Sequence, residues 1–208
     1  MSLQNVNQLI VFARAPVYGR VKQRLAHDIG RDEALRFYRE TLKALLHRMN
    51  DGPWCLSVSV ANPGDEKHPV FQGVNTIVQP PGDLGQRMKT VLSQHAGCRR
   101  IIIGSDIPLI ECEHIADAFK RLSDHDLVFG PATDGGFWLV GCSEKYPADD
   151  DEFMSNVRWS SSHALTDTIS SLTDARRERV ARVATLSDVD DGESFRQLGE
   201  YESKVNQR

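Results

Sequence analysis

Long hydrophobic runs and paired cysteine motifs are both missing from this sequence. The apolar segments at residues 9–13 and 101–103 are far below the roughly 20 residues that cross a bilayer. No charged start followed by an apolar stretch indicates a signal peptide. The four cysteines show no Cys-x-x-Cys spacing, which argues against zinc and disulfide roles. We therefore expect a cytoplasmic protein with no membrane partner.

Acidic residues are absent from the N-terminal 27 residues. The first is Asp28, and the cations that precede it are Arg14, Arg20, Lys22 and Arg24. That stretch carries +4, and because the whole chain carries −4, the remainder carries −8. The asymmetry predicts an anion-binding site near the N-terminus. The acidic remainder argues against nucleic-acid binding, because nucleic-acid-binding proteins usually spread a basic face over the domain.

Hydrophobic periodicity predicts alternating strands and helices along one domain spanning residues 1–208. Strands are expected at residues 7–13, 54–61, 75–79, 100–104, 127–130, 137–142 and 180–186. Helices are expected at residues 32–49, 84–94, 111–122 and 164–172, with a last one from Ser194. Alternation of this kind indicates an α/β fold of three layers, with a mostly parallel sheet between helices.

The basic loop at residues 14–24 directly follows the first predicted strand. In open α/β sheets ligands bind beyond the carboxyl ends of the strands, so the loop stands where a nucleotide would bind. Pro16 and Gly19 shape the turn, and the Arg and Lys side chains offer charge-assisted hydrogen bonds worth about 1.5–3 kcal/mol each. A solvated basic loop without a ligand is the alternative interpretation.

Asp106 follows the most apolar predicted strand, within Gly104-Ser105-Asp106-Ile107-Pro108. A carboxylate there faces the ligand crevice, and magnesium prefers one or two carboxylates together with substrate phosphates. Asp106 is therefore a predicted metal ligand. A helix cap is the alternative, but Glu111, where the next helix is expected, lies too far along for a direct cap.

Two further motifs carry acidic residues. In Asp134-Gly135-Gly136 the paired glycines permit close backbone approach to a ligand, although a plain hairpin turn has the same appearance. Residues 188–193, Asp-Val-Asp-Asp-Gly-Glu, form an acidic cluster ahead of the last helix. Helix N-termini favour acidic residues in any case, which is the alternative reading of Asp191 and Glu193.

Taken in order, these motifs resemble a bacterial group of GT-A fold proteins often labelled glycosyltransferases or nucleotide-diphospho-sugar transferases. That group is similar to phospholactate guanylyltransferase and to molybdopterin cofactor guanylyltransferases. The first loop resembles its signature Lys-x-Pro-x-x-Gly-x-x-Lys-Thr-Arg-Leu, with Arg14 for the first Lys and Gln23 for Thr. The resemblance covers nearly the whole chain. It continues through Gly82-Asp83-Leu84-Gly85 with Arg87-Met88, the Asp106 and Asp134 motifs, Trp159-Ser160 and Asp188-Val189-Asp190.

The resemblance implies a Rossmann-like GT-A fold and a set of site residues. Asp106 and Asp190 would hold Mg or Mn. The donor nucleotide would be bound by Arg14, Pro16, Gly19, Arg20, Lys22, Arg24 and Ser105, with Asp83 and Arg87 near its base or ribose. The small-molecule acceptor would face Asp134, Gly135, Gly136, Trp159 and Ser160. Catalysis would fall to Lys22, Asp106 and Asp134. For Trp159, simple core packing is the alternative.

Two enzymatic functions and one binding function fit this pattern. The chain would transfer either a glycosyl group from a nucleotide sugar or a nucleotidyl group from a triphosphate. Sugar transferases of this fold generally carry Asp-x-Asp at the fourth strand, and Gly104 occupies the first of those positions, which favours nucleotidyl transfer. The family label favours glycosyl transfer. A non-catalytic nucleotide sensor is the third possibility, against which Lys22, Asp106 and Asp190 argue.

Overall fold

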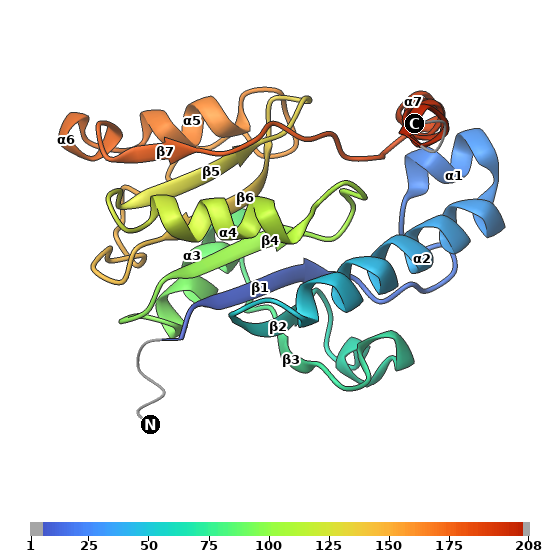
Figure 1. Cartoon of the computed structure of the whole chain (residues 1–208), viewed down its shortest axis with the longest axis horizontal. Helices are drawn as coiled ribbons and strands as arrows, with labels where there is room; N and C mark the ends of the chain where they lie inside the picture. The colour runs from blue at the N-terminus through green and yellow to red at the C-terminus, as the bar shows by residue number, and fades with distance from the viewer. Residues whose placement is uncertain (1–5, 206–208) are drawn as a thin grey trace.

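A seven-stranded sheet forms the centre of the computed structural model, which describes residues 6–205 (Figure 1). The spatial order is β3-β2-β1-β4-β6-β5-β7. Each pairing is parallel except the two made by β6, which runs antiparallel to β4 and to β5. The predicted mixed, mostly parallel sheet is therefore confirmed. The strands are β1 (Gln8–Ala13), β2 (Cys55–Val60), β3 (Asn75–Val78), β4 (Arg100–Gly104), β5 (Leu127–Pro131), β6 (Phe137–Cys142) and β7 (Val180–Arg182).

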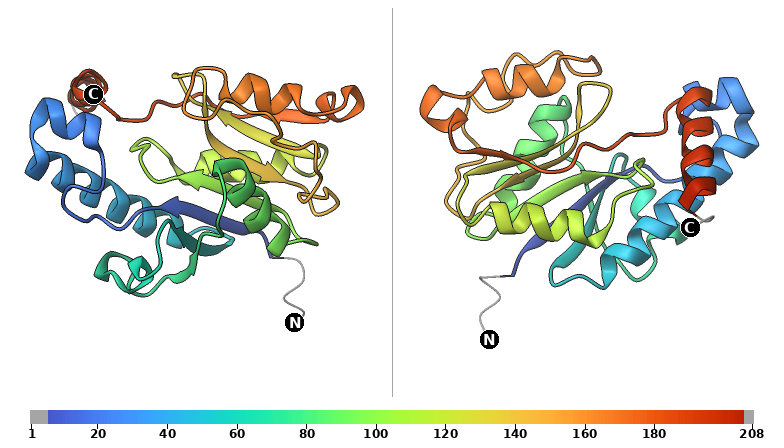
Figure 2. Two further views of the ribbon diagram at one scale, coloured as in Figure 1. Left: turned by 180° about the vertical axis from the view of Figure 1, so that it is seen from behind. Right: turned by 45° about the horizontal axis from the view of Figure 1, so that its top comes forward.

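Helices cover both faces of this sheet, which gives three layers (Figures 1 and 2). One face packs against α2 (Arg31–Asn50) and α4 (Cys112–Arg121), and the other against α3 (Leu84–Gln94) and α5 (Ala164–Ser170). Alternation along β1 supplies both interfaces, because successive strand side chains point to opposite faces. Leu9 and Val11 belong to the α2/α4 core, whereas Ile10 belongs to the α3 core.

Several short elements were not predicted from the sequence. They are α1 (Gln23–Ile29), α6 (Asp174–Arg177) and the 3₁₀ helices η2 (Asp65–Lys67) and η3 (Pro69–Phe71). α1 buries only Leu25, so it shows no hydrophobic periodicity. The last predicted strand, residues 180–186, is also shorter than expected. β7 ends at Arg182, and beyond it only a single bridge joins Leu186 to Ala132.

The chain order reverses at β1. From β1 the chain moves outward to β2 and β3, and it then returns to β4 on the opposite side of β1. The crevice beyond the carboxyl ends of β1 and β4 is therefore the topological switch point, where ligands bind in open α/β sheets. Arg14 follows β1 there, and Ser105 follows β4.

A small separate core brings the C-terminal segment to the N-terminal loop. α7 (Gly192–Val205) packs against α1 and the start of α2, with Leu25, Ala34 and Val189 buried between them. The rings of Phe37 and Phe195 meet edge to face at 5.2 Å. Figure 2 shows α7 beside α1, away from the main sheet. Within residues 6–205, no helix has the length and apolar character needed to cross a membrane.

Candidate metal and nucleotide site

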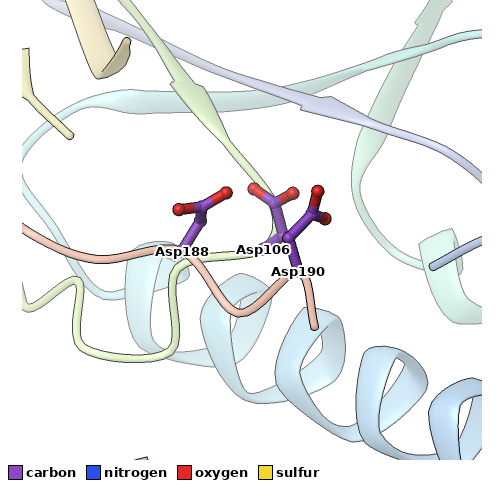
Figure 3. Close-up of side chains that lie close together, drawn as sticks. All are labelled: Asp106, Asp188 and Asp190. Carbon is purple, nitrogen blue, oxygen red and sulfur yellow. The ribbon is translucent and has the colours of Figure 1, made fainter. Parts of the chain in front are cut away.

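Three carboxylates meet at the switch point (Figure 3). Asp106 lies just beyond β4, while Asp188 and Asp190 come from the extended segment that leads into α7. One oxygen from each lies within 4.8 Å of those of the other two. The backbone N–H of Val189 donates to the carbonyl of Asp106 at 3.2 Å and so fastens the two segments together. The structure thus brings Asp106 and Asp190 together, as the hypothesis of a shared metal requires, and adds Asp188.

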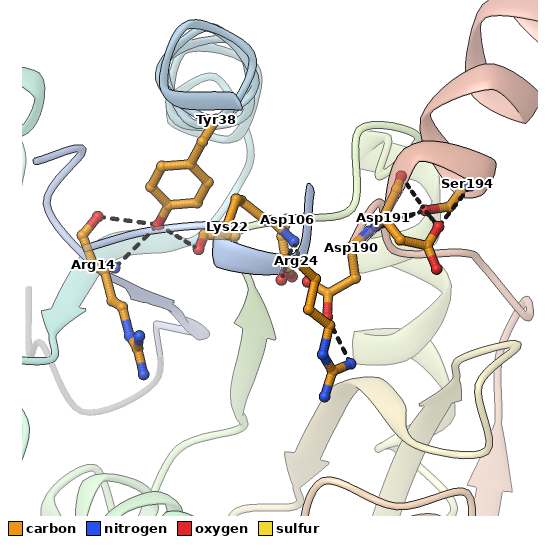
Figure 4. A network of polar contacts seen from close by, with 9 residues as sticks. Arg14, Lys22, Arg24, Tyr38, Asp106, Asp190, Asp191 and Ser194 are labelled. Carbon is orange, nitrogen blue, oxygen red and sulfur yellow. Dashed lines mark hydrogen bonds and ion pairs between the residues drawn. The ribbon is translucent and has the colours of Figure 1, made fainter. Parts of the chain in front are cut away.

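Lys22 stands between two of these carboxylates (Figure 4). Its Nζ donates to Asp106 Oδ2 and to Asp190 Oδ1, both at 2.9 Å, and its side chain is 5% exposed. Burial by itself lowers the pKa of Lys22, but the two carboxylates outweigh it and hold that pKa above its ordinary value. The site therefore contains a fixed ammonium ion at neutral pH.

The backbone of Lys22 adopts an unusual conformation. Its φ of 47° is in the left-handed region, which costs a non-glycine residue roughly 1–2 kcal/mol. The residue immediately precedes α1, and its carbonyl accepts the hydrogen bond of Ala26 N–H at 2.8 Å. The local strain turns the chain so that the Lys22 ammonium enters the crevice while α1 packs against α7. Arg24, 77% exposed, adds a second cation at 3.3 Å from Asp190 Oδ2.

Tyr38 of α2 joins the two loops that border the crevice (Figure 4). Its hydroxyl donates to the carbonyl of Arg14 at 3.0 Å and accepts from the N–H of Arg14 at 3.1 Å. Ser105 Oγ lies 3.1 Å away, and because the phenol has only one proton, Ser105 is the donor in that contact. Burial raises the pKa of Tyr38, so it stays neutral. In the sequence, Tyr38 falls at helical spacing among the apolar residues of the helix expected at 32–49, which gives no sign of this role.

Asp188 was also missed as a ligand by the sequence-based hypothesis, although it belongs to the acidic cluster. Burial, followed by the negative charges of Asp106 and Asp134, raises the pKa of Asp188 to about 6. A signal for it was present in the Asp188-Val189-Asp190 triplet. In an extended segment, alternate side chains share a face. Val189 is buried in the α1/α7 core, so both aspartates face the crevice.

The carboxylates lie on a wall shared by two cavities. The larger, which we call the basic cavity, has a volume of about 520 Å³ and extends over the ends of β1 and β2. Its polar lining includes Arg14, Lys22, Tyr38, Gln79, Arg87 and Ser105. The smaller, which we call the aromatic cavity, has a volume of about 350 Å³ and extends toward β5 and β6. Its lining includes Leu84, Asp134, Phe137, Trp159, Ser160 and Asp188, and Asp106 and Asp190 line both cavities.

Other residues assigned to the donor lie around the basic cavity or outside it. Arg87 Nη1 donates to Gln79 Oε1 at 2.8 Å, which directs the guanidinium to the cavity. Gly19 and Arg20 line a neighbouring hollow of about 310 Å³ with Arg14 and Arg87. Pro16 and Asp83 line none of these three spaces. Pro16 is buried beneath the loop, and Asp83 caps α3, where its carboxylate accepts from Gln86 N–H at 2.9 Å. A role of Asp83 near the base or ribose stays a prediction.

The residues assigned to the acceptor lie around the aromatic cavity. Asp134 Oδ1 accepts from Gly136 N–H at 2.8 Å within the β5–β6 turn, so the residue has a role in the hairpin, and it also lines the cavity. Gly135 has a φ of +88°, and a Cβ there would lie 2.2 Å from the carbonyl oxygen of Ser162. Trp159 packs edge to face on Phe137 at 6.2 Å and also lines the cavity. The core-packing alternative is therefore correct, and a role of Trp159 in acceptor binding stays a prediction.

Solved structures share this fold. A candidate nucleotide-diphospho-sugar transferase from Desulfovibrio desulfuricans G20 is 27% identical, with a TM-score of 0.79 over 89% of this chain and 82% of that one. CMP:2-keto-3-deoxy-manno-octonic acid synthetase in complex with CTP is 10% identical, with a TM-score of 0.60 over 96% and 99% of the two chains. Glucosyl-3-phosphoglycerate synthase from Mycobacterium tuberculosis, with Mn²⁺ and UDP, is 11% identical, with a TM-score of 0.50 over 93% and 75%.

These structures establish the fold as that of the GT-A glycosyltransferases and nucleotidyltransferases, as the sequence predicted. Among curated proteins, none matches this sequence significantly. The sequence profile of one family matches residues 41–161, which is more than half of the chain and includes β2 through β6 with Asp106 and Asp134. On that match, the chain belongs to the family of uncharacterized proteins conserved in bacteria, DUF2064.

Proposed function

We propose that this chain is a metal-dependent transferase that moves a nucleotidyl or glycosyl group from a nucleotide donor to a small-molecule acceptor. One observation carries the proposal. Asp106, Asp190 and Lys22 stand on the wall between two cavities at the switch point of the sheet. A group on a donor in the basic cavity would therefore lie next to an acceptor in the aromatic cavity. Proximity and charge neutralisation are the main things that such a transfer needs from a protein.

The basic cavity suits the donor. Arg14, Lys22 and Arg87 line it, and guanidinium and ammonium groups form the strongest hydrogen bonds to phosphate oxygens. Lys22 would neutralise charge that develops on the leaving phosphate, and the hydrogen bonds with Tyr38 hold the backbone of Arg14 at the rim of the cavity. Cations placed beside developing charge stabilise it.

The carboxylate cluster suits Mg or Mn. Its donors are all oxygen atoms, which these hard cations prefer, and one oxygen of each carboxylate lies within 4.8 Å of the other two, so Asp106, Asp188 and Asp190 would hold the ion together. Bound there, the ion would supply Lewis-acid stabilisation of the donor phosphates. Lys22 now pairs with two of the ligands, so its ammonium would turn toward the donor phosphates as the ion enters.

The two versions of the transfer differ in the bond that breaks. In nucleotidyl transfer, an acceptor oxygen bonds to the α-phosphorus of a triphosphate, the bond from that phosphorus to the bridging oxygen breaks, and pyrophosphate leaves. In glycosyl transfer, the acceptor oxygen bonds to the anomeric carbon, the bond from that carbon to the β-phosphate oxygen breaks, and a nucleoside diphosphate leaves. In both, the acceptor proton needs a nearby base, for which Asp134 in the aromatic cavity is the candidate.

The geometry around Gly104 favours nucleotidyl transfer. Gly104 occupies the first position of the Asp-x-Asp pattern, and a Cβ there would lie 2.9 Å from the flexible end of Ile107 and 3.2 Å from Asp106 Oδ1. The additional carboxylates come instead from Asp188 and Asp190. The 27% identical relative, a candidate nucleotide-diphospho-sugar transferase, supports glycosyl transfer as the second candidate.

A thermal-shift screen with Mg or Mn tests the proposal. We expect at least one nucleoside triphosphate or nucleotide sugar to raise the melting temperature in the presence of metal, and Asp106→Asn to lose most of that rise. Phosphorus NMR of reaction mixtures would then separate the versions, since nucleotidyl transfer releases pyrophosphate and glycosyl transfer releases a nucleoside diphosphate. Binding without either product would identify a nucleotide sensor. The absence of any nucleotide-dependent shift would refute the proposal.

A further inference from the structure

The aromatic cavity carries a negative charge that the basic cavity does not. Four carboxylates line it, from Asp106, Asp134, Asp188 and Asp190. In the described part of the chain, Arg24 is the only Lys or Arg in its lining. That guanidinium already faces Asp190 and is mostly exposed to water, which weakens its attraction for a second anion. The basic cavity, in contrast, has three cations against two carboxylates.

The remaining wall of the aromatic cavity combines ring surfaces with hydroxyl groups. Phe137 and Trp159 are half-buried, and the planes of their packed rings form an angle of 69°. Both residues line the cavity, so each ring keeps part of its surface toward it. Ser160 and Ser161 add hydroxyl groups to the same lining. Asp134 has Oδ1 engaged with Gly136 N–H, which leaves Oδ2 to accept a hydrogen bond from a ligand.

We propose that the acceptor is an uncharged molecule with several hydroxyl groups, such as a sugar or a polyol, and not a phosphate ester or a carboxylate. It places an apolar C–H face on Trp159 and donates hydroxyl hydrogen bonds to Asp134. This inference rests on the proposed function, because the aromatic cavity is taken as the acceptor side of the carboxylate wall.

Charge decides against an anionic acceptor. A phosphate monoester brings a charge of about −1.5 to −2 at neutral pH. Within the aromatic cavity it would face Asp134 and Asp188 with only Arg24 to offset it. A bound metal ion would not remedy this, since its charge is already shared among three carboxylates and the donor phosphates. Neutral hydroxyl groups meet no such repulsion, and each carboxylate can accept several of their hydrogen bonds.

Matched pairs of probes test this inference on the full chain with Mg²⁺. The pairs are D-glucose with D-glucose 6-phosphate and glycerol with glycerol 3-phosphate, measured by saturation-transfer-difference NMR. We expect at least one neutral member to bind, and its phosphate to bind about tenfold more weakly, as like-charge repulsion of roughly 1.4 kcal/mol requires. Trp159→Ala should abolish the C–H signals of the bound probe.

Variants at Asp134 provide the matched control. Asp134→Lys should make the phosphorylated member of each pair bind more tightly than the neutral one. Asp134→Asn keeps an oxygen acceptor for Gly136 N–H, and it should reduce the difference in affinity between the two members while the neutral one still binds more tightly. Tighter binding of the phosphorylated member to the wild-type protein, or no binding by either neutral member, would overturn the inference. Nucleotide-dependent shifts in melting temperature on the same samples test the proposed function separately. A failure of the acceptor inference can therefore be distinguished from a failure of the proposed function.

Discussion

Lys22 occupies the position between Asp106 and Asp190 that a metal ion would share. Its ammonium already neutralises these carboxylates, so a divalent cation would compete with it for the same oxygens. Under the proposed function, Lys22 would be available to the donor phosphate once metal takes its place. The backbone of Lys22 is left-handed, and the free-energy cost of that conformation accompanies the placement of a cation here.

Replacing Lys22 by Met separates these two effects. We expect Lys22→Met to weaken nucleotide binding by about 1.5–3 kcal/mol, because a charge-assisted hydrogen bond is lost. The same substitution should tighten binding of Mg or Mn alone, because a competing cation has gone. Isothermal titration calorimetry measures the affinity for nucleotide and the affinity for metal alone. Lys43→Met, on the exposed face of α2, is the control. Equal nucleotide affinity in Lys22→Met and wild type would place the donor elsewhere.

Neutralising the carboxylates one at a time tests the metal cluster. Asp106→Asn, Asp188→Asn and Asp190→Asn keep the side-chain shape and remove a charged ligand, and we expect each to lower turnover by about 10²-fold or more. Asp149→Asn changes an exposed carboxylate outside the site and should leave turnover unchanged. Metal-dependent activity that persists fully in Asp106→Asn would contradict a shared ion.

Sequence reasoning found some of these residues and missed others for identifiable reasons. Asp106 stands directly after an almost wholly apolar strand, so its position in the crevice follows from the strand pattern. Tyr38 lies among apolar residues at helical spacing, where its hydroxyl gives no signal. Asp188 was missed because the family resemblance assigned only Asp106 and Asp190 to the metal, although Asp188 lies two residues before Asp190 in the same extended segment.

At the scale of elements, α7 positions Asp190 through contacts with α1. Asp28, in α1, accepts the hydrogen bond of Gly192 N–H at 2.8 Å. A Cβ on Gly192 would lie 2.9 Å from the Cβ of Asp28, so glycine permits this close approach. Ser194 Oγ accepts the N–H groups of Asp190 and Asp191, both at 3.1 Å, which fixes the turn into the helix. A carboxylate of the proposed metal site is thus placed by a helix that packs outside the main sheet.

Substitution of Asp28 tests this positioning. We expect Asp28→Ala to weaken Mn²⁺ binding by up to about tenfold, because the loss of one hydrogen bond of about 0.5–1.5 kcal/mol frees the start of α7. Asp28→Asn retains an oxygen acceptor and should restore most of the affinity. Calorimetry gives the affinity, and hydrogen exchange of the α7 amides should rise only in Asp28→Ala. Wild-type Mn²⁺ affinity in Asp28→Ala would show that α7 docking is independent of this contact.

Local sequence patterns determined the long elements well. α3, β4 and β6 begin and end where periodicity and turn residues placed them. The Asp83 capping box, with reciprocal hydrogen bonds to Gln86, explains the sharp start of α3. α1 went unpredicted because its position depends on α7, which lies more than 160 residues away in the sequence. Tertiary contacts rather than periodicity define such an element.

At the scale of the whole molecule, the sheet order could not be obtained from the sequence. The Gly-rich turn predicts that β5 and β6 pair as a hairpin, and they do. The insertion of β6 between β4 and β5 depends instead on long-range register, such as Ile102 opposite Val140. That arrangement carries Asp134 to the same rim as Asp106 and creates the aromatic cavity.

Metal binding should stabilise the entire fold. A ligand that binds only the native state at 100 times its dissociation constant adds about 2.7 kcal/mol, which corresponds to a rise of roughly 5–10 °C for a chain of this size. We expect saturating Mn²⁺ to give such a rise at pH 8 and a smaller one at pH 5. A protonated carboxyl cannot ligate, and the pKa of Asp188 is about 6 in the metal-free protein. Differential scanning calorimetry at both pH values measures the effect, and an equal rise at both would exclude Asp188 as a ligand.

The same raised pKa makes a prediction for the metal-free protein. Because the folded pKa of Asp188 exceeds its unfolded value, its contribution to stability is full at low pH and is lost as pH rises through about 6. Asp188→Asn removes that loss. Since the group is only half-buried, we expect the variant to be about 1–2 kcal/mol more stable than wild type at pH 7.5 and equal to it near pH 3. Urea unfolding at the two pH values measures this difference in stability. A variant no more stable than wild type at pH 7.5 would contradict the account in which burial and neighbouring negative charges raise the pKa of Asp188.

The distance along the chain between Lys22 and Asp190 also has a consequence for truncation. The seven strands of the described sheet are complete at Arg182, and Asp188 and Asp190 follow only afterwards. A chain cut short after β7 therefore keeps every strand but only one carboxylate of the three. Under the proposed function, we expect such a product to be inactive.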